Sequence, residues 1–104
     1  MNNNTVIKGT ELKFNINIKP IGNLTMDDYY FECAAYCVSA KKLVIPKDHC
    51  IRQDNSNYII TVDTGYTGTG ELKVQLTAQI PDKDFHDDFR TEVLQLDTGI
   101  TVIR

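Results

Sequence analysis

Strict alternation of apolar and polar residues in two stretches is the feature that most constrains how this chain folds. The stretches are ELKFNINIKP, residues 11–20, and ELKVQLTAQIP, residues 71–81. A period of two places successive side chains on opposite faces of an extended backbone, so each stretch predicts a β-strand with one buried face. Both stretches end at a proline, which lacks the N–H group that a sheet ladder requires. The residues expected to face the core are Leu12, Phe14, Ile16 and Ile18 in the first stretch and Leu72, Val74, Leu76, Ala78 and Ile80 in the second.

Shorter extended segments follow a similar pattern elsewhere in the chain. We expect these further strands at residues 29–38, 42–46, 50–52, 58–63, 91–96 and 100–103. The sequence QDNSN between the third and fourth of them is rich in turn residues, so those two strands are expected to form a hairpin. The residues expected on the buried face of the first of them are Phe31, Cys33, Ala35 and Cys37.

Helical periodicity does not occur in any window of the sequence. Short helical turns are expected only after Thr25, which can cap residues 26–28, and within DKDFHDDF. Seven or eight short strands with regularly spaced turns predict an all-β fold, a two-sheet antiparallel β-sandwich of immunoglobulin-like type. The chain has no tryptophan and no cysteine pair at the antibody-domain positions, so the prediction extends to the architecture alone.

The length and charge of the chain limit its organisation and its partners. We expect a single domain, residues 1–104, with a short polar N-terminal arm at residues 1–8. The N-terminal sequence is not that of a signal peptide, and no stretch is apolar for long enough to cross a bilayer, so we expect no membrane partner, synthesis in the cytoplasm and reduced cysteines. The 11 basic and 14 acidic residues give a net charge of −3 without a basic cluster, which argues against nucleic acid as a partner.

The tripeptide Asp-Thr-Gly occurs twice, at residues 63–65 and 97–99, each time after an apolar run. Such a sequence is similar to the catalytic turn of aspartic proteases, in which two aspartates about 3 Å apart share one proton. Only residues 100–104 follow the second copy, and no apolar brace for the aspartate follows the first. Since Asp and Gly are also common turn residues, we interpret both copies as turns that follow strands.

Two groups of residues have the chemistry of metal ligands. Zinc is bound by residue types such as those of Cys33, Cys37, His49 and Cys50, and calcium by carboxylates such as those in PDKDFHDDF. On a strand that rises about 3.3 Å per residue, Cys33 and Cys37 would lie roughly 13 Å apart, too far for shared chelation. The aspartate-rich loop has no central glycine and no terminal glutamate. We therefore expect buried thiols, a solvated loop, no metal, no cofactor and no catalytic residue.

Residues outside the expected core are candidates for contacts with other proteins. The polar arm and the glycine-rich residues 65–70 suit the addition of a strand to a neighbour. The two phenylalanines of the acidic loop either tuck under one end of the sandwich or form a contact point, as aromatic residues do at interfaces. The candidate partner-binding residues are Thr5, Ile7, Tyr66, Phe85 and Phe89.

Several segments together resemble a known group of proteins. The segments KGTELKFNINI, LTMDDYYFECAAYC, IPDKDFHDDFRTEV and LDTGITV resemble small virion proteins of phages that infect gut Bacteroidetes, the crAss-like group included. The first of them is also similar to the N-terminal domain of some phage baseplate and fibre proteins. The resemblance implies a structural role in a virion, as a head fibre or capsid-decorating adaptor that forms homo-oligomers and binds capsid or fibre subunits. The chain is short and has no coiled-coil or triple-helical repeat, which favours a compact adaptor over a long shaft.

A carbohydrate- or receptor-binding adhesion module of a tail or baseplate is the alternative function. In that function, exposed tyrosines would stack on a cell-surface glycan. The candidate tyrosines are Tyr29, Tyr30, Tyr36 and Tyr66. In both functions the expected location is the virion, and enzyme activity is not expected.

Overall fold

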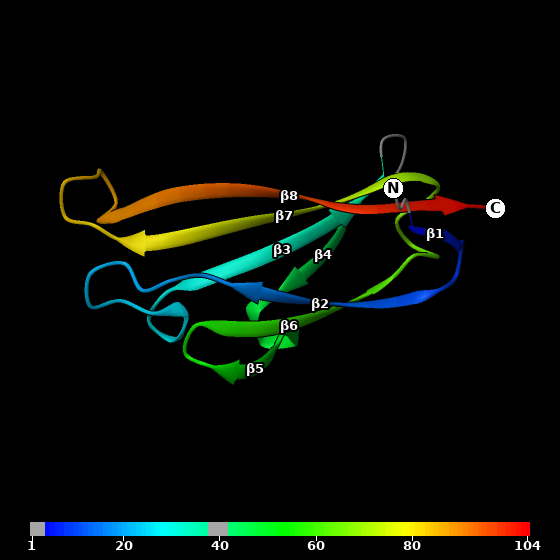
Figure 1. The fold of residues 1–104 in the computed structure, drawn as a ribbon. Coiled ribbons are helices and arrows are strands. Elements are labelled where there is room, and N and C mark those ends of the chain that lie inside the picture. Colours follow the sequence, from blue (N-terminus) through cyan, green and yellow to red (C-terminus); the bar gives the residue numbers. More distant parts are fainter. Residues whose placement is uncertain (1–3, 38–41) are drawn as a thin grey trace.

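The computed structural model describes residues 4–37 and 42–104, and these residues form eight β-strands and two short 3-10 helices (Figure 1). The strands are β1 (Asn4–Ile7), β2 (Glu11–Asn17), β3 (Tyr30–Tyr36), β4 (Leu43–Pro46), β5 (Ile51–Asp54), β6 (Asn57–Asp63), β7 (Gly70–Pro81) and β8 (Phe89–Ile103). The 3-10 helices are η1 (Met26–Asp28) and η2 (Lys47–His49). No helix formed by the described residues is long and apolar enough to span a membrane.

The strands form two sheets, which confirms the predicted all-β sandwich. The larger sheet has the order β1-β8-β7-β3-β4 and the smaller sheet the order β2-β6-β5. Every strand pair is antiparallel except β1 with β8, which is parallel. Strands β2, β6 and β5 take the places of strands B, E and D of the immunoglobulin-like sandwich, and β3, β7 and β8 those of strands C, F and G. The molecule is elongated along its strands and measures 46 × 27 × 27 Å.

Strand β7 lies in the middle of the larger sheet and supplies the centre of the core. All five of its residues that were predicted to face inward are at most 3% exposed. Phe31 of β3 packs edge-on against Tyr58 of β6 across the two sheets, with ring centroids 5.1 Å apart. In β2, Ile16 is buried while the other predicted inward residues are half-buried, because β2 is the outer strand of the smaller sheet.

Strand β8 is continuous, although the sequence predicted two strands separated by a turn at residues 97–99. The register with β7 shifts at this point, so β8 carries a bulge. Gly99 has a φ of +76°, which glycine adopts without steric cost. The hydroxyl of Thr98 donates to the carbonyl of Leu72 at 2.9 Å and accepts from the N–H of Ile100 at 3.1 Å. The turn interpretation is therefore wrong for this copy of Asp-Thr-Gly, which forms a β-bulge inside a strand.

Local predictions outside the main strands have different outcomes. Residues 4–7 of the expected arm form β1 and pair with β8, so this part of the arm belongs to the sheet. Thr25 caps η1 as predicted. The segment DKDFHDDF forms no helical turn but a hairpin loop, in which the N–H of Asp82 donates to the carbonyl of Asp88 at 2.9 Å. Residues 1–3 of the arm and Val38 of the predicted strand 29–38 lie outside the described residues.

Candidate functional site

One edge of the larger sheet is only partly covered by a neighbouring strand. β1 pairs with residues 100–103 of β8, and within the described part of the chain no strand pairs with residues 89–99 on that side (Figure 1). Unpaired backbone N–H and C=O groups along such an edge form a template for another strand. We call residues 89–99 the open edge of β8.

The inner face of β8 carries two leucines that the smaller sheet does not cover. Leu94 is in register with Leu76, and Leu96 is in register with Val74. Residues paired across neighbouring strands point to the same face. The two β7 residues are at most 2% exposed, whereas Leu94 is 46% and Leu96 is 47% exposed. The five-stranded sheet is wider than the three-stranded sheet that packs on it, so the inner face of β8 extends past the sandwich.

A groove lies between this uncovered part of β8 and β2, the outer strand of the smaller sheet. It has a volume of about 210 Å³ and is lined by Phe14 and Ile16 of β2, Val74 of β7, and Leu96 and Thr98 of β8, among other residues. Among the described strands β2 pairs only with β6, so the strands on both sides of the groove have an edge that no described strand covers. Apolar side chains between unpaired strand edges suit the binding of an extended polypeptide.

Four of the five predicted partner-binding residues lie near the two ends of the open edge, and Tyr66 lies apart from them between β6 and β7, so the five do not form one patch. Thr5 and Ile7 lie on β1, in register with residues 101 and 103 of β8, and Ile7 is 63% exposed. Phe85 and Phe89 lie at the β7–β8 loop, at the far end of β8 from β1 (Figure 1). Both phenylalanines are about half exposed, which favours the contact point over an aromatic pair tucked under the sandwich.

The first Asp-Thr-Gly is a turn after β6, as predicted. The carboxylate of Asp63 accepts a hydrogen bond from the N–H of Gly65 at 2.8 Å. The fully buried hydroxyl of Thr64 accepts from the N–H of Gly9 at 2.9 Å and donates to the carbonyl of Thr10 at 2.7 Å. The threonine therefore fastens this turn to the corner between β1 and β2.

The two Asp-Thr-Gly aspartates line different depressions. Asp63 lies with Glu11, His49 and Tyr66 in a depression of about 240 Å³. Asp97 lines the groove between β2 and β8, and its carboxylate forms an ion pair with Lys73 at 2.8 Å. An aspartic protease requires both carboxylates at one water molecule, and this arrangement does not provide that pair.

The cysteines belong to the core and its margin. Cys33 and Cys37 are buried and Cys50 is half-buried. The hydrogen bond between the thiols of Cys33 and Cys50, together with burial, raises the pKa of Cys33 above its ordinary value. The same hydrogen bond lowers the pKa of Cys50. Among the described residues, no three side chains of His, Cys, Asp or Glu are placed to hold a metal ion.

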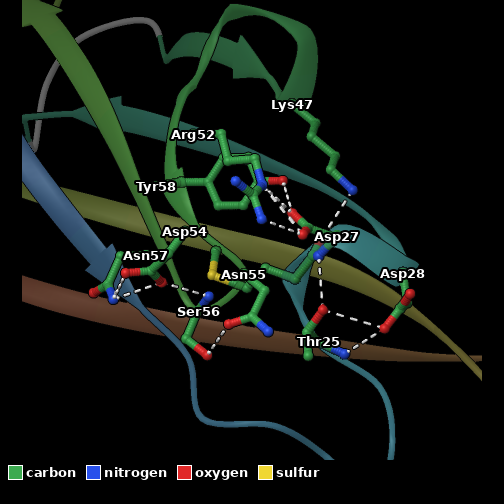
Figure 2. Close-up of polar contacts among 11 residues, drawn as sticks. Thr25, Asp27, Asp28, Lys47, Arg52, Asp54, Asn55, Ser56, Asn57 and Tyr58 are labelled. Atoms are coloured by element: carbon green, nitrogen blue, oxygen red, sulfur yellow. Dashed lines mark hydrogen bonds and ion pairs between the residues drawn. The ribbon is translucent and has the colours of Figure 1, made fainter.

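A polar cluster fastens η1 to the smaller sheet, as Figure 2 shows. The Arg52 guanidinium donates to both carboxylate oxygens of Asp27, at 2.9 and 2.8 Å, and the Tyr58 hydroxyl donates to the same carboxylate at 2.6 Å. These hydrogen bonds lower the pKa of Asp27 to about 2. Burial and the hydrogen bond to Asp27 raise the pKa of Tyr58 to about 12. The Lys47 ammonium donates to two backbone carbonyls at the ends of η1, at 2.8 and 2.6 Å.

This cluster is structural, because its charged groups bind one another or the backbone of the same chain. Within the described residues, no buried side-chain nitrogen or oxygen lacks a hydrogen-bond partner. No pattern in the sequence linked Asp27 to Arg52, because the residues lie in different segments and meet only through the packing of η1 on β5 and β6.

Comparison with protein-family models, curated proteins and solved structures finds no match to this chain. The function is therefore inferred from the geometry of the molecule. The feature that sequence reasoning missed is the exposure of Leu94 and Leu96. The sequence predicted a strand at residues 91–96, but the exposure of its two leucines depends on the width of the opposite sheet.

Proposed function

We propose that this chain is a structural component of a phage virion, a head fibre or capsid-decorating adaptor that acts by binding protein subunits and not by catalysis. The observation that carries the proposal is the open edge of β8 with the exposed Leu94 and Leu96 beside it. The resemblance of the sequence to small virion proteins supports the choice of a phage particle.

The open edge of β8 is less protected than the outer strands β4 and β5. Soluble β-proteins protect their edges with short strands, prolines, bulges and charged side chains. β4 is short and ends at Pro46, and β5 is short and irregular in register. β8 is the longest described strand, and the charged Arg90 and Glu92 of its inner face pair with each other at 3.0 Å near the β7–β8 loop. The middle of the open edge therefore lacks charged protection and suits a partner.

Exposed apolar residues at both ends of the open edge extend this surface. Ile7 lies on β1 at one end, and Phe85 and Phe89 lie at the β7–β8 loop at the other. Aromatic residues are enriched at protein interfaces because they bury a large apolar area with few rotatable bonds. We propose that these residues contact the same neighbours as the open edge.

Mass spectrometry of particles purified from the phage that encodes this chain tests the virion role. We expect the chain in a fixed ratio to the capsid or tail proteins after repeated density-gradient purification. An abundant cytosolic host protein of similar size serves as the control for contamination. If the chain is found in the lysate with the host control protein and is absent from the purified particles, the virion role is wrong.

Glycan binding is a second proposed function, favoured by the depression beside Tyr66. Tyr66 is 69% exposed, and the depression also contains the carboxylates of Glu11 and Asp63. A tyrosine face beside hydrogen-bonding groups is suited to a sugar ring. Tyr29, in contrast, is 5% exposed and is a core residue, not a stacking surface. A glycan array should show binding by the native chain and loss of that binding in Tyr66→Ala; an empty array would contradict this function.

A further inference from the structure

We infer that the open edge of β8 pairs with the open edge of a second copy of this chain, antiparallel, about a two-fold axis at Gln95. The inference rests on the proposed assembly function and deepens it by naming the partner and the register. The two larger sheets then join into one continuous sheet across the dimer. In this register Leu94 of each copy lies opposite Leu96 of the other.

The length of the open edge fits this pairing. β1 occupies the edge of β8 from Ile100 onward. With the axis at Gln95, position 93 of one copy lies opposite position 97 of the other. Regular pairing therefore runs over residues 93–97 of each strand, because the bulge beyond Asp97 interrupts it. It stops short of β1, so the dimer forms without displacing β1.

The side chains of the open edge are self-complementary in this register. On the inner face the four leucines of the two copies meet around the axis, and each is about half exposed in the single chain. Glu92 of each copy lies near the bulge residue Thr98 of the second copy, which carries no charge, so no like charges face each other there. On the outer face Val93 lies opposite Asp97 of the second copy, and the carboxylate of Asp97 already has Lys73 as its partner at 2.8 Å.

Moving the axis by one residue, which shifts the register by two residues, gives a poorer fit. An axis at Leu94 would place Glu92 opposite Leu96 and would bring a carboxylate into the apolar cluster, which costs free energy. An axis at Leu96 would shorten the paired stretch and place Leu94 opposite Thr98. Because the edge complements itself and two-fold dimers are the commonest oligomers, a second copy is favoured over an unrelated strand.

Disulfide trapping tests the register directly. In the proposed dimer the two copies of position 95 lie opposite each other, with Cβ atoms about 5 Å apart. Gln75 is in register with Gln95 on β7, so its two copies are separated by three strand spacings, roughly 14 Å. With glutathione disulfide as the oxidant, Gln95→Cys should form a covalent dimer of the 11.8 kDa chain, while the matched control Gln75→Cys stays single. Equal trapping of both variants, or trapping of neither, would overturn the register.

Light scattering on charge variants tests the surface independently of any introduced thiol. Leu96→Glu is expected to raise the dissociation constant of the dimer by about 100-fold or more, because each copy brings one unpaired carboxylate into the interface. Val44→Glu is the matched control, since Val44 is 53% exposed on β4, at the other edge of the same sheet. Circular dichroism establishes that each variant is folded. Loss of the dimer in Leu96→Glu with retention in Val44→Glu supports the inference.

The outcomes separate this inference from the proposed virion role. A dimer that survives Leu96→Glu but not Val44→Glu would overturn the inference, while self-assembly would stand. A native chain that is monomeric at every accessible concentration and still enters phage particles would also overturn it. In that case the open edge binds a different virion protein, and the proposed function remains.

Discussion

Replacing Thr64 by valine removes one hydroxyl from the core and leaves the shape of the side chain almost unchanged. This hydroxyl bonds the N–H of Gly9 at 2.9 Å and the carbonyl of Thr10 at 2.7 Å. In the variant, the carbonyl of Thr10 still accepts the hydrogen bond from the backbone N–H of residue 64, at 3.1 Å. The N–H of Gly9 lies at an exposed turn, where it can donate a hydrogen bond to water instead. The substitution therefore measures how strongly the first Asp-Thr-Gly holds the corner between β1 and β2.

The loss of these two hydrogen bonds sets the expected magnitude. Each typically contributes about 0.5–1.5 kcal/mol to stability, so two would give about 1–3 kcal/mol. The lower part of this range applies because both former partners still have other hydrogen-bonding groups within reach. We expect the free energy of unfolding, measured with denaturant, to fall by about 1–2 kcal/mol and Tm to fall by about 5–10 °C.

Thr61→Val provides the matched control, because Thr61 is exposed on the same strand, β6. This substitution should change the free energy of unfolding by less than about 0.5 kcal/mol. If Thr64→Val proves as stable as Thr61→Val, the tripeptide does not have the structural role assigned to it.

The thiols and the polar cluster give three further predictions. Iodoacetamide at neutral pH should modify Cys50 before Cys33, because the pKa of Cys50 is lowered while Cys33 is fully buried with a raised pKa; peptide mass spectrometry that finds the opposite order would contradict this. The pKa of Asp27 is lowered from 3.8 to about 2. The contribution of this carboxylate to stability is therefore complete above pH 3.8 and is lost as the pH falls to about 2. The Tm of the native chain should therefore approach that of Asp27→Asn in acid, and a constant difference would count against the Arg52 ion pair. The pKa of Tyr58 is raised from 10.0 to about 12. The contribution of its hydroxyl to stability is therefore complete below pH 10.0 and is lost as the pH rises to about 12. Over that alkaline window Tyr58→Phe should lose less stability than the native chain, and parallel losses would refute the assignment.

The regular strands were predictable from the sequence because alternation is a local property. β7 shows this most clearly, since each residue assigned to its inner face is buried. β8 shows the limit, because Asp, Thr and Gly suit both a turn and a bulge. The choice between them depends on the hydrogen bonds to the neighbouring strand, here those of Thr98, and these are not visible in the sequence of β8 alone.

The candidate site was harder to predict because it depends on contacts between distant segments. β1 pairs with the far end of the chain, Asn4 with Ile100, and this pairing left no local signal in the polar arm. The exposure of Leu94 and Leu96 follows from the position of β8 beyond the rim of the smaller sheet. Phe85 and Phe89, in contrast, were proposed as contact residues from sequence alone, because they are aromatic residues within an acidic loop.

Amide hydrogen exchange along β8, compared between the assembled and the dissociated chain, tests most directly whether this edge binds neighbours. In the single chain, amides on the unpaired side of residues 89–99 face water, while those bonded to β7 are protected. We predict that assembly slows exchange at the water-facing amides of residues 89–99 and leaves β4 unchanged. If these amides exchange at the same rate in both states while another strand gains protection, the open edge of β8 is not the binding surface.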